Sequence, residues 1–355
     1  MRPCWVLLAL AAGCGRRGFG SDFDAPDGTT FAARKRITVA PGTDLVDFPL
    51  SIVTVDPDLQ RTARSDGLDI VFTTDDTTVL DHELVDYDGA TGSLEAWVRV
   101  PALPVTGTTL WMYYGGDART PAAAAAWSGY SAVWHMSGTG NTERDSTAHA
   151  NDLHAISAPS QPSTDVGIIG GARNYDGIAN AMIASFPVDG SLDFGVRSFR
   201  FGAWVRVMQS VGQFDTVFFK GGASAMQSGY DMELGVSGWD GCIGDGVTNA
   251  CVTFGGEAQF LGQWTYLMCV VDRSANQLVS YTNGIQTNTF SIAGLGSTDS
   301  TFGLSVGHMP PVLFKGLLDE PRVLEGAASP EVIQAEYTNV TLRSMFTVFG
   351  PHEAQ

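Results

Sequence analysis

Basic residues are scarce in this chain. Its 355 residues include 20 lysines and arginines against 38 aspartates and glutamates, a formal net charge of −18. A protein that binds nucleic acid by neutralising phosphates needs basic surface, so this balance excludes a nucleic-acid partner. Acidity of this degree is more typical of solubility in an external medium than of a binding site, although some of the aspartates could bind Ca²⁺.

Long apolar runs are also rare. Beyond the first residues, no segment approaches the roughly 18 uninterrupted apolar residues of a membrane-spanning helix. The early run Trp5 to Ala12 is too short to span a bilayer but has the size of a secretory signal. We therefore expect the folded part of the chain to lie outside the cytoplasm.

The end of this early run resembles a bacterial lipobox, in which small residues precede a cysteine that is lipidated. The stretch is Leu10-Ala11-Ala12-Gly13-Cys14, with Ala11 where the family most often has leucine. The resemblance implies a signal peptide over 1–14, lipidation of Cys14 and a flexible tether over 15–30. This anchor would be the only membrane contact of a cell-envelope protein. An ordinary cleaved signal and an extracellular protein are the alternative.

Cysteine is sparse as well. Of five cysteines, Cys4 and Cys14 lie in the leader. Cys242 and Cys251 flank a stretch rich in Gly, Asp and Asn between two strand-like runs, a spacing that suits a disulfide in an oxidising compartment. Cys269 lies inside an apolar run, where we expect a buried and inert thiol.

Charged residues make up only 16% of the chain, whereas glycine is abundant at 42 residues. This balance favours short strands joined by tight turns, so we expect an all-β protein. The length favours two domains. Strand-like runs over 31–120 and 132–350, with a linker over 121–131, predict two β-sandwiches in tandem.

The first segment contains phrases of a domain of unknown function found in bacterial and archaeal surface proteins. They are LVDFP (45–49), GLDIVF (67–72), His82-Glu83, AWVRVP (96–101) and LWMYYGG (110–116). The resemblance implies a small sandwich and gives no activity.

The second segment resembles the concanavalin A-like jelly roll of the laminin-G type. Its landmarks are Trp134-His135, Asp145-Ser146-Thr147, Tyr175-Asp176-Gly177, Trp264, Asp272, Tyr281-Thr282-Asn283-Gly284 and Gly316-Leu317-Leu318-Asp319-Glu320. The resemblance implies two packed sheets whose first and last strands lie together. One short helix is expected from Ser329, with Pro330 at its first position, followed by a final strand over 345–349.

Catalytic patterns are missing from the sequence. Hydrolases that share this jelly roll carry Glu-x-Asp-x-x-Glu or Glu-x-Asp-x-Glu, and the nearest approaches here, Asp231-Met232-Glu233 and Asp319-Glu320, lack a third acid. Serine-nucleophile, phosphate-loop and zinc-protease motifs are also lacking. His135 and His149 are expected to be hydrogen-bonded structural groups rather than zinc ligands. We therefore expect no enzymatic activity.

Calcium is the one metal that the sequence favours. In jelly rolls of this kind the aspartate before the last strand, here Asp319, can help to hold a structural ion, and Asp145, Asn151 and Asp176 lie in turns expected near it. The alternative is that these three residues stabilise turns and that Asp319 is solvated. No other cofactor is expected.

Alternation along one strand offers a ligand surface. Phe199, Phe201, Ala203 and Val205 share one face, which must be the core, so Arg200, Trp204 and Arg206 share the other. An exposed tryptophan between two guanidiniums is a stacking platform for a sugar or an acidic glycan. A tryptophan covered by a loop or by the first domain is the alternative. Tyr230, Trp239 and Asp240, near the expected disulfide, form a second candidate surface.

These features predict a non-catalytic cell-envelope or secreted protein that binds glycan or another surface protein through its jelly roll. Because a fold does not fix a function, a purely structural or assembly role is the alternative. Glycoside hydrolysis would require two carboxyl groups roughly 5 to 9 Å apart.

Overall fold

The computed structural model describes residues 23–24, 30–74, 78–157, 160–184, 189–209, 215–221, 227–235, 238–309 and 312–354. The predicted signal peptide and the lipidation of Cys14 lie outside the described residues. Strands dominate the described part and four helices accompany them, so the all-β prediction is confirmed. None of the helices in these ranges is long and apolar enough to cross a membrane.

The first domain consists of two sheets. One has the strand order β28-β3-β9-β5-β6 and the other β4-β8-β7. The strand bounds are β3 (Ala33–Val39), β4 (Leu45–Val55), β5 (Val71–Thr74), β6 (Thr78–Val79), β7 (His82–Asp88), β8 (Ser93–Leu103) and β9 (Thr108–Tyr114). Helices α1 (Pro57–Thr62) and α2 (Ala123–Ala126) lie in the connections, and the short strands β1 (Phe23–Asp24) and β2 (Thr30–Phe31) pair with each other.

The final strand belongs to this first domain. Strand β28 (Thr347–Ala354) pairs antiparallel with β3, and Phe346 just before it is buried in the first domain's core with Ile37 and Leu50. The prediction that a last strand over 345–349 completes the jelly roll is therefore wrong. An alternating apolar pattern shows that a segment is a strand but does not show which sheet edge it joins.

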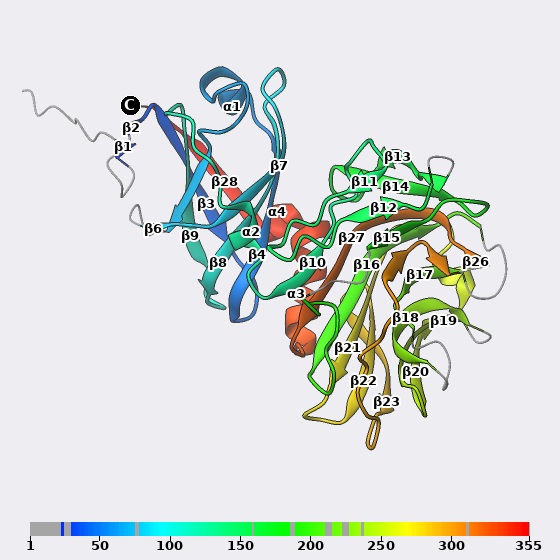
Figure 1. Ribbon diagram of the computed structural model, residues 1–355. Coiled ribbons are helices and arrows are strands. Elements are labelled where there is room, and N and C mark those ends of the chain that lie inside the picture. The colour runs from blue at the N-terminus through cyan, green and yellow to red at the C-terminus, as the bar shows by residue number, and fades with distance from the viewer. Residues whose placement is uncertain are drawn as a thin grey trace, which may run out of the picture.

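The second domain is a sandwich of two large antiparallel sheets. We call the first the domain-facing sheet, with the order β13-β14-β27-β16-β21-β22-β23 and β10 added on β27. Its strands are β10 (Tyr130–Val133), β13 (Ser163–Val166), β14 (Gly171–Asp176), β16 (Phe199–Val207), β21 (Thr265–Asp272), β22 (Gln277–Thr282), β23 (Ile285–Ser291) and β27 (Lys315–Glu325). In Figure 1 this sheet lies on the side of the sandwich nearer the first domain.

We call the second sheet the distal sheet, with the order β11-β12-β15-β24-β17-β18-β19-β20. Its strands are β11 (Thr142–Glu143), β12 (Leu153–Ala155), β15 (Met182–Ala184), β17 (Thr216–Phe219), β18 (Ser228–Gly235), β19 (Gly238–Asp245), β20 (Asn249–Gly255) and β24 (Leu304–Val306). The short strands β25 (His308–Met309) and β26 (Val312–Leu313) pair with each other.

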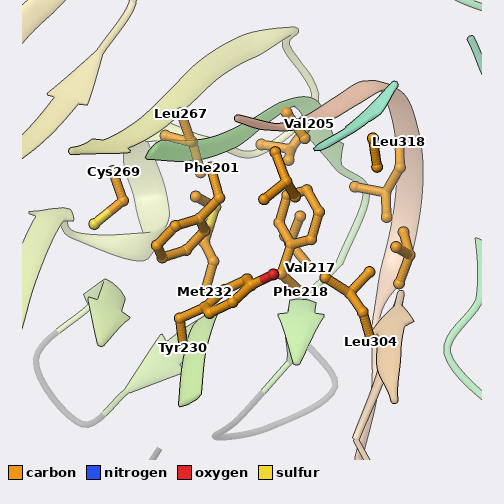
Figure 2. Packing of buried hydrophobic residues seen from close by; sticks show 14 of the residues in the cluster. Phe201, Val205, Val217, Phe218, Tyr230, Met232, Leu267, Cys269, Leu304 and Leu318 are labelled. Carbon is orange, nitrogen blue, oxygen red and sulfur yellow. The ribbon is translucent and has the colours of Figure 1, made fainter. Parts of the chain in front are cut away.

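Side chains from both sheets fill the space between them. Phe201 and Val205 from β16 face Tyr230 and Met232 from β18, as Figure 2 shows. The rings of Phe201 and Tyr230 lie 5.0 Å apart between their centroids. The alternation predicted for β16 is therefore confirmed, because its apolar set points inward.

Helix α3 (Pro330–Thr341) lies between the two domains, as Figure 1 shows. It begins with Pro330, as expected, although no side-chain capping bond is formed by Ser329. Its Ala335 is buried with the first domain, whereas Ile333 and Val340 are buried in a cluster that also contains Trp97 and Trp204. The short helix α4 (Arg343–Phe346) follows and leads the chain back into the first domain.

Candidate functional site

Trp204 is not an open stacking platform. Its side chain points away from the jelly-roll core but is only 2% exposed. The ring of Tyr337, from α3, stacks on it at 5.6 Å between centroids, and the ring of Tyr266 lies at 5.1 Å. The covered tryptophan was the correct alternative, and the cover is a helix more than 100 residues later in the chain, which alternation within β16 cannot locate.

The two arginines beside Trp204 also belong to this covered face. Arg200 donates to Glu336 Oε1 of α3 and to the Gly326 carbonyl, each at 3.3 Å. Arg206 donates to the Gly262 carbonyl at 3.0 Å. Arg200 therefore ties α3 to the domain-facing sheet, and the ligand role predicted for Trp204 and its arginines is not supported by this geometry.

The second predicted surface divides between the two faces of the distal sheet. Tyr230 and Trp239 are buried in the core, and the Tyr230 hydroxyl donates to the Leu192 carbonyl at 3.3 Å. Their prediction as surface aromatics is wrong. Asp240, the third predicted member, follows Trp239 in β19 and therefore points to the outer face.

Three acidic side chains share the outer face of the distal sheet, and we call them the acidic row. Asp231 and Glu233 alternate with the core residues of β18, and Glu233 lies directly opposite Asp240 in β19. Asp231 and Glu233 are 0% and 4% exposed, whereas Asp240 is half-buried. Asp231 is paired across the strands with Cys242, so the disulfide lies beside the row.

The carboxyl oxygens of the acidic row are short of partners. Both oxygens of Asp231 and one of Glu233 are buried and make no hydrogen bond of normal geometry to any residue that the structure describes, and the Cys242 backbone N–H only approaches Asp231. Burial, together with the charge of Asp240, raises the pKa of Glu233 to about 7, and burial beside Glu233 raises the pKa of Asp231 well above its usual range. Near neutral pH these groups can therefore both donate and accept hydrogen bonds.

The raised pKa of Glu233 predicts a pH-dependent stability. Between the ordinary value of 4.5 and about 7, the folded chain binds more protons than the unfolded chain, so stability falls as the pH rises. The Glu233 contribution has a slope of up to about 1 kcal/mol per pH unit. We expect Glu233→Gln to lose less stability than the wild type between pH 5 and pH 8 in urea unfolding. Glu325→Gln serves as the exposed control. Equal losses of unfolding free energy in Glu233→Gln and the wild type would contradict this prediction.

The predicted cysteine chemistry is confirmed. Cys242 and Cys251 form a disulfide between neighbouring positions of β19 and β20. Cys269 is a free thiol buried in the core, and burial raises its pKa, as expected for an unreactive cysteine.

Asp145 and Asn151, two of the four predicted calcium ligands, are hydrogen-bonded to each other, whereas Asp176 and Asp319 make their hydrogen bonds with other segments. Asp145 accepts from the backbone N–H groups of Val133, Thr147 and Asn151. Asp176 accepts from three successive N–H groups over 178–180. Asp319 is buried rather than solvated, and its Oδ2 accepts from the N–H groups at 168 and 169. These contacts fit the turn-stabilising alternative for Asp145, Asn151 and Asp176, and calcium binding stays a prediction.

A buried charged network joins the two domains. His135 contacts Glu320 Oε1 through Nδ1 at 2.6 Å and Glu83 Oε2, from the first domain, through Nε2 at 3.0 Å. Glu320 also accepts from Arg322, whose guanidinium lies 4.2 Å from the ring centroid of Trp97 in the first domain. We call Glu83, His135, Glu320 and Arg322 the interdomain network. The expectation that His135 is a hydrogen-bonded group is confirmed.

Comparison with known families separates the two parts of the chain. Residues 183–334 match the family model described as the concanavalin A-like lectin/glucanases superfamily. Residues 183–334 form a concanavalin A-like domain. Residues 66–148 match the domain of unknown function DUF2341, which agrees with the resemblance of the first segment. No curated protein matches the sequence.

Solved structures similar to this chain include two toxin binding domains and one domain of an arabinanase. The binding domain of Paraclostridial Mosquitocidal Protein 1 is 12% identical, with 58% of this chain and 52% of that chain covered and a TM-score of 0.47. The binding domain of Botulinum neurotoxin serotype D is 12% identical, with 62% of this chain and 54% of that chain covered and a TM-score of 0.49. Domain 4 of AbnA, a GH43 extracellular arabinanase from Geobacillus stearothermophilus, in complex with arabinotriose, is 18% identical, with 58% of this chain and 96% of that chain covered and a TM-score of 0.43. This chain spans about half the length of the two toxin domains.

The sequence alone points to two residues of the acidic row but does not show that the row exists. Asp231 and Glu233 resemble an incomplete catalytic pattern, because the third acid is expected on the same strand. Asp240 is 7 residues beyond Glu233 in the sequence and becomes its neighbour through the β18–β19 hairpin. The signal that could have found the row is cross-strand pairing, had β19 been recognised as a strand.

Proposed function

We propose that the concanavalin A-like domain is a non-catalytic binding module that takes a hydroxyl-rich ligand, a glycan or a glycosylated surface protein, at the acidic row. The observation that carries this proposal is the presence of buried carboxyl oxygens without described partners on the outer face of a sheet. Native proteins rarely leave such groups unsatisfied, so a partner outside the chain is expected. Partly protonated carboxyl groups suit sugar hydroxyls because each side can donate and accept.

The part of the other face around Trp204 is closed to a ligand. Trp204, Tyr266 and Tyr281 on the outer face of the domain-facing sheet are buried in a cluster that includes Trp97 of the first domain and Ile333 of α3. The family match supports a binding role, since it covers the strands of the acidic row.

A location outside the cytoplasm accompanies this proposal. The disulfide between Cys242 and Cys251 suits an oxidising compartment. The lipobox-like end at Cys14 supports attachment to a bacterial envelope membrane through a lipid, and cleavage without lipidation would give a secreted protein.

A glycan array tests the proposed function. We expect the wild-type protein, with Ca²⁺ in the buffer, to bind a subset of glycans, and Asp231→Asn combined with Glu233→Gln to weaken binding by about 10- to 100-fold, which corresponds to one or two hydrogen bonds to charged groups. Glu325→Gln, an exposed acid on the domain-facing sheet, serves as the matched control and should bind as the wild type does. An array without binding, or equal binding by the double variant, would overturn the proposal.

One observation favours glycoside hydrolysis as a second candidate. Asp231 and Glu233 point to the same side of one strand and are two positions apart, roughly 6 to 7 Å of rise. This spacing overlaps the range of inverting glycosidases, and a raised pKa such as that of Glu233 suits a general acid. Release of reducing sugar from a bound glycan, abolished by Glu233→Gln, would favour this candidate over the binding module.

A further inference from the structure

Two residues of the interdomain network, together with Glu95, form a group of potential metal ligands from both domains. Glu95 of β8, His135 and Glu320 each offer one nitrogen or oxygen atom, and these atoms lie within 4.8 Å of one another. All three residues are buried. Within the described ranges it is the one such group of three or more histidine, cysteine or acidic side chains. It includes neither Asp145 nor Asp176, so it differs from the calcium set expected from the sequence.

A buried oxygen of Glu95 without a hydrogen-bond partner is an independent indication that an ion completes this group. The residue is only 6% exposed, and its Oε1 has no hydrogen-bond partner in the part of the chain that the structure describes. The other oxygen lies against Gly170, where a Cβ atom would come within 1.9 Å of it. Asp319, next to Glu320, likewise has one buried oxygen without a partner among the described residues. A bound cation would satisfy oxygens of this kind.

His135 already has the orientation of a metal ligand. Its Nε2 contacts Glu83 Oε2 at 3.0 Å, and Glu83 is held in turn by the Trp127 indole N–H at 2.5 Å and the Ser146 hydroxyl at 2.8 Å. Metal-bound histidines commonly donate their second ring N–H to a carboxylate in this way. The Nδ1 atom contacts Glu320. Glu83 also lines a cavity of about 270 Å³, and none of the three potential ligands lines that cavity.

Carboxyl groups from both domains gather around these three residues. They are Glu83, Glu95, Asp319 and Glu320, and the neighbouring permanent cations are Arg322 and, near Glu95, Arg343.

We propose that Glu95, His135 and Glu320 bind a divalent transition-metal ion between the two domains, with Zn²⁺ as the expected occupant. Imidazole combined with carboxylates suits Zn²⁺, whereas Ca²⁺ prefers oxygen ligands alone. Binding forms bonds from the ion to His135 Nδ1 and to the two carboxylates, and the Nδ1 proton passes to solvent. The ion holds the first domain against the concanavalin A-like domain, because Glu95 belongs to one and the other two ligands to the other.

Zinc titration of the full chain tests this site. With a chromophoric chelator as competitor, we expect the wild-type protein to bind one equivalent of Zn²⁺ and to melt at a higher temperature when loaded, with no shift from Ca²⁺ at the same concentration. Glu83→Gln, which replaces the carboxylate that supports His135, should weaken Zn²⁺ affinity by about 10- to 100-fold. Glu95→Gln should weaken it at least as much. Glu233→Gln, another buried glutamate with an unpartnered oxygen, is the matched control and should bind Zn²⁺ as the wild type does.

Two results would overturn the proposal. One is a wild-type protein that binds no stoichiometric Zn²⁺, and the other is Glu95→Gln with unchanged affinity. If Glu95→Gln does not fold, the Co²⁺-loaded wild type decides: we expect paramagnetically shifted imidazole resonances that disappear on Zn²⁺ addition, and their absence would equally overturn the site. Neither readout depends on glycan binding, so failure here is distinguishable from failure of the proposed function.

Discussion

A chain that ends at Phe346 is expected to lose the fold of its first domain and to keep that of the concanavalin A-like domain. The deletion removes β28, which pairs with β3 from Val39 to Ala33 and closes one edge of the five-stranded sheet. Exposed backbone groups along β3 and the loss of a whole strand would leave too small a buried core for a domain of this size. Limited proteolysis with mass spectrometry should show cleavage throughout 31–120.

The matched control for this truncation removes residues before Thr30 instead. Because the two-residue strand β1 pairs only with β2, that deletion should leave both domains protease-resistant. Protection of the first domain after loss of β28 would show that residues 31–120 fold without the C-terminal strand, as the sequence alone predicts.

Arg322→Ala is expected to lower the free energy of unfolding by about 3 to 5 kcal/mol, the usual effect of breaking a buried ion pair. The arginine donates through Nε and Nη2 to Glu320, which is nearly inaccessible to solvent, and its guanidinium lies over the rings of Trp97 and Trp127. Its removal leaves Glu320 with one cationic partner fewer and opens a gap between the domains. Chemical denaturation followed by tryptophan fluorescence measures the loss.

Two further variants separate the charge of Arg322 from its shape. Arg322→Lys keeps the positive charge but not the planar guanidinium group, so it should recover only part of the stability that Arg322→Ala loses. Arg197→Ala breaks an ion pair with Glu325 whose side chains are about half exposed, and we expect a loss under about 1 kcal/mol. Equal losses for Arg322→Ala and Arg197→Ala would contradict a buried structural role for the interdomain network.

The fold was largely predictable because its signals are local. Alternation identified the inward face of β16, the Asn283-Gly284 pair turns β22 into β23 with both residues at positive φ, and Pro330 begins α3. The partner of the last strand was not predictable in this way. Strand β28 has the pattern of any half-buried strand, and only the return of the chain through α3 and α4 places it against β3.

The candidate sites depend on long-range contacts, which periodicity does not contain. Trp204 was placed correctly on the outward face of β16, but Tyr337, which covers it, is 133 residues later in the chain. Asp231 and Glu233 were noticed as a pair, and their third member arises from cross-strand pairing with β19. Glu95, in turn, meets His135 and Glu320 only because the two domains are docked.

The first domain and α3 cover the face of the concanavalin A-like domain around Trp204. Hydroxyl-radical footprinting of the intact chain tests the closure directly. Trp204 and Trp97 should be oxidised far more slowly than Met345, which is 70% exposed. Oxidation of Trp204 at a rate comparable to that of Met345 would show an open face and contradict the account.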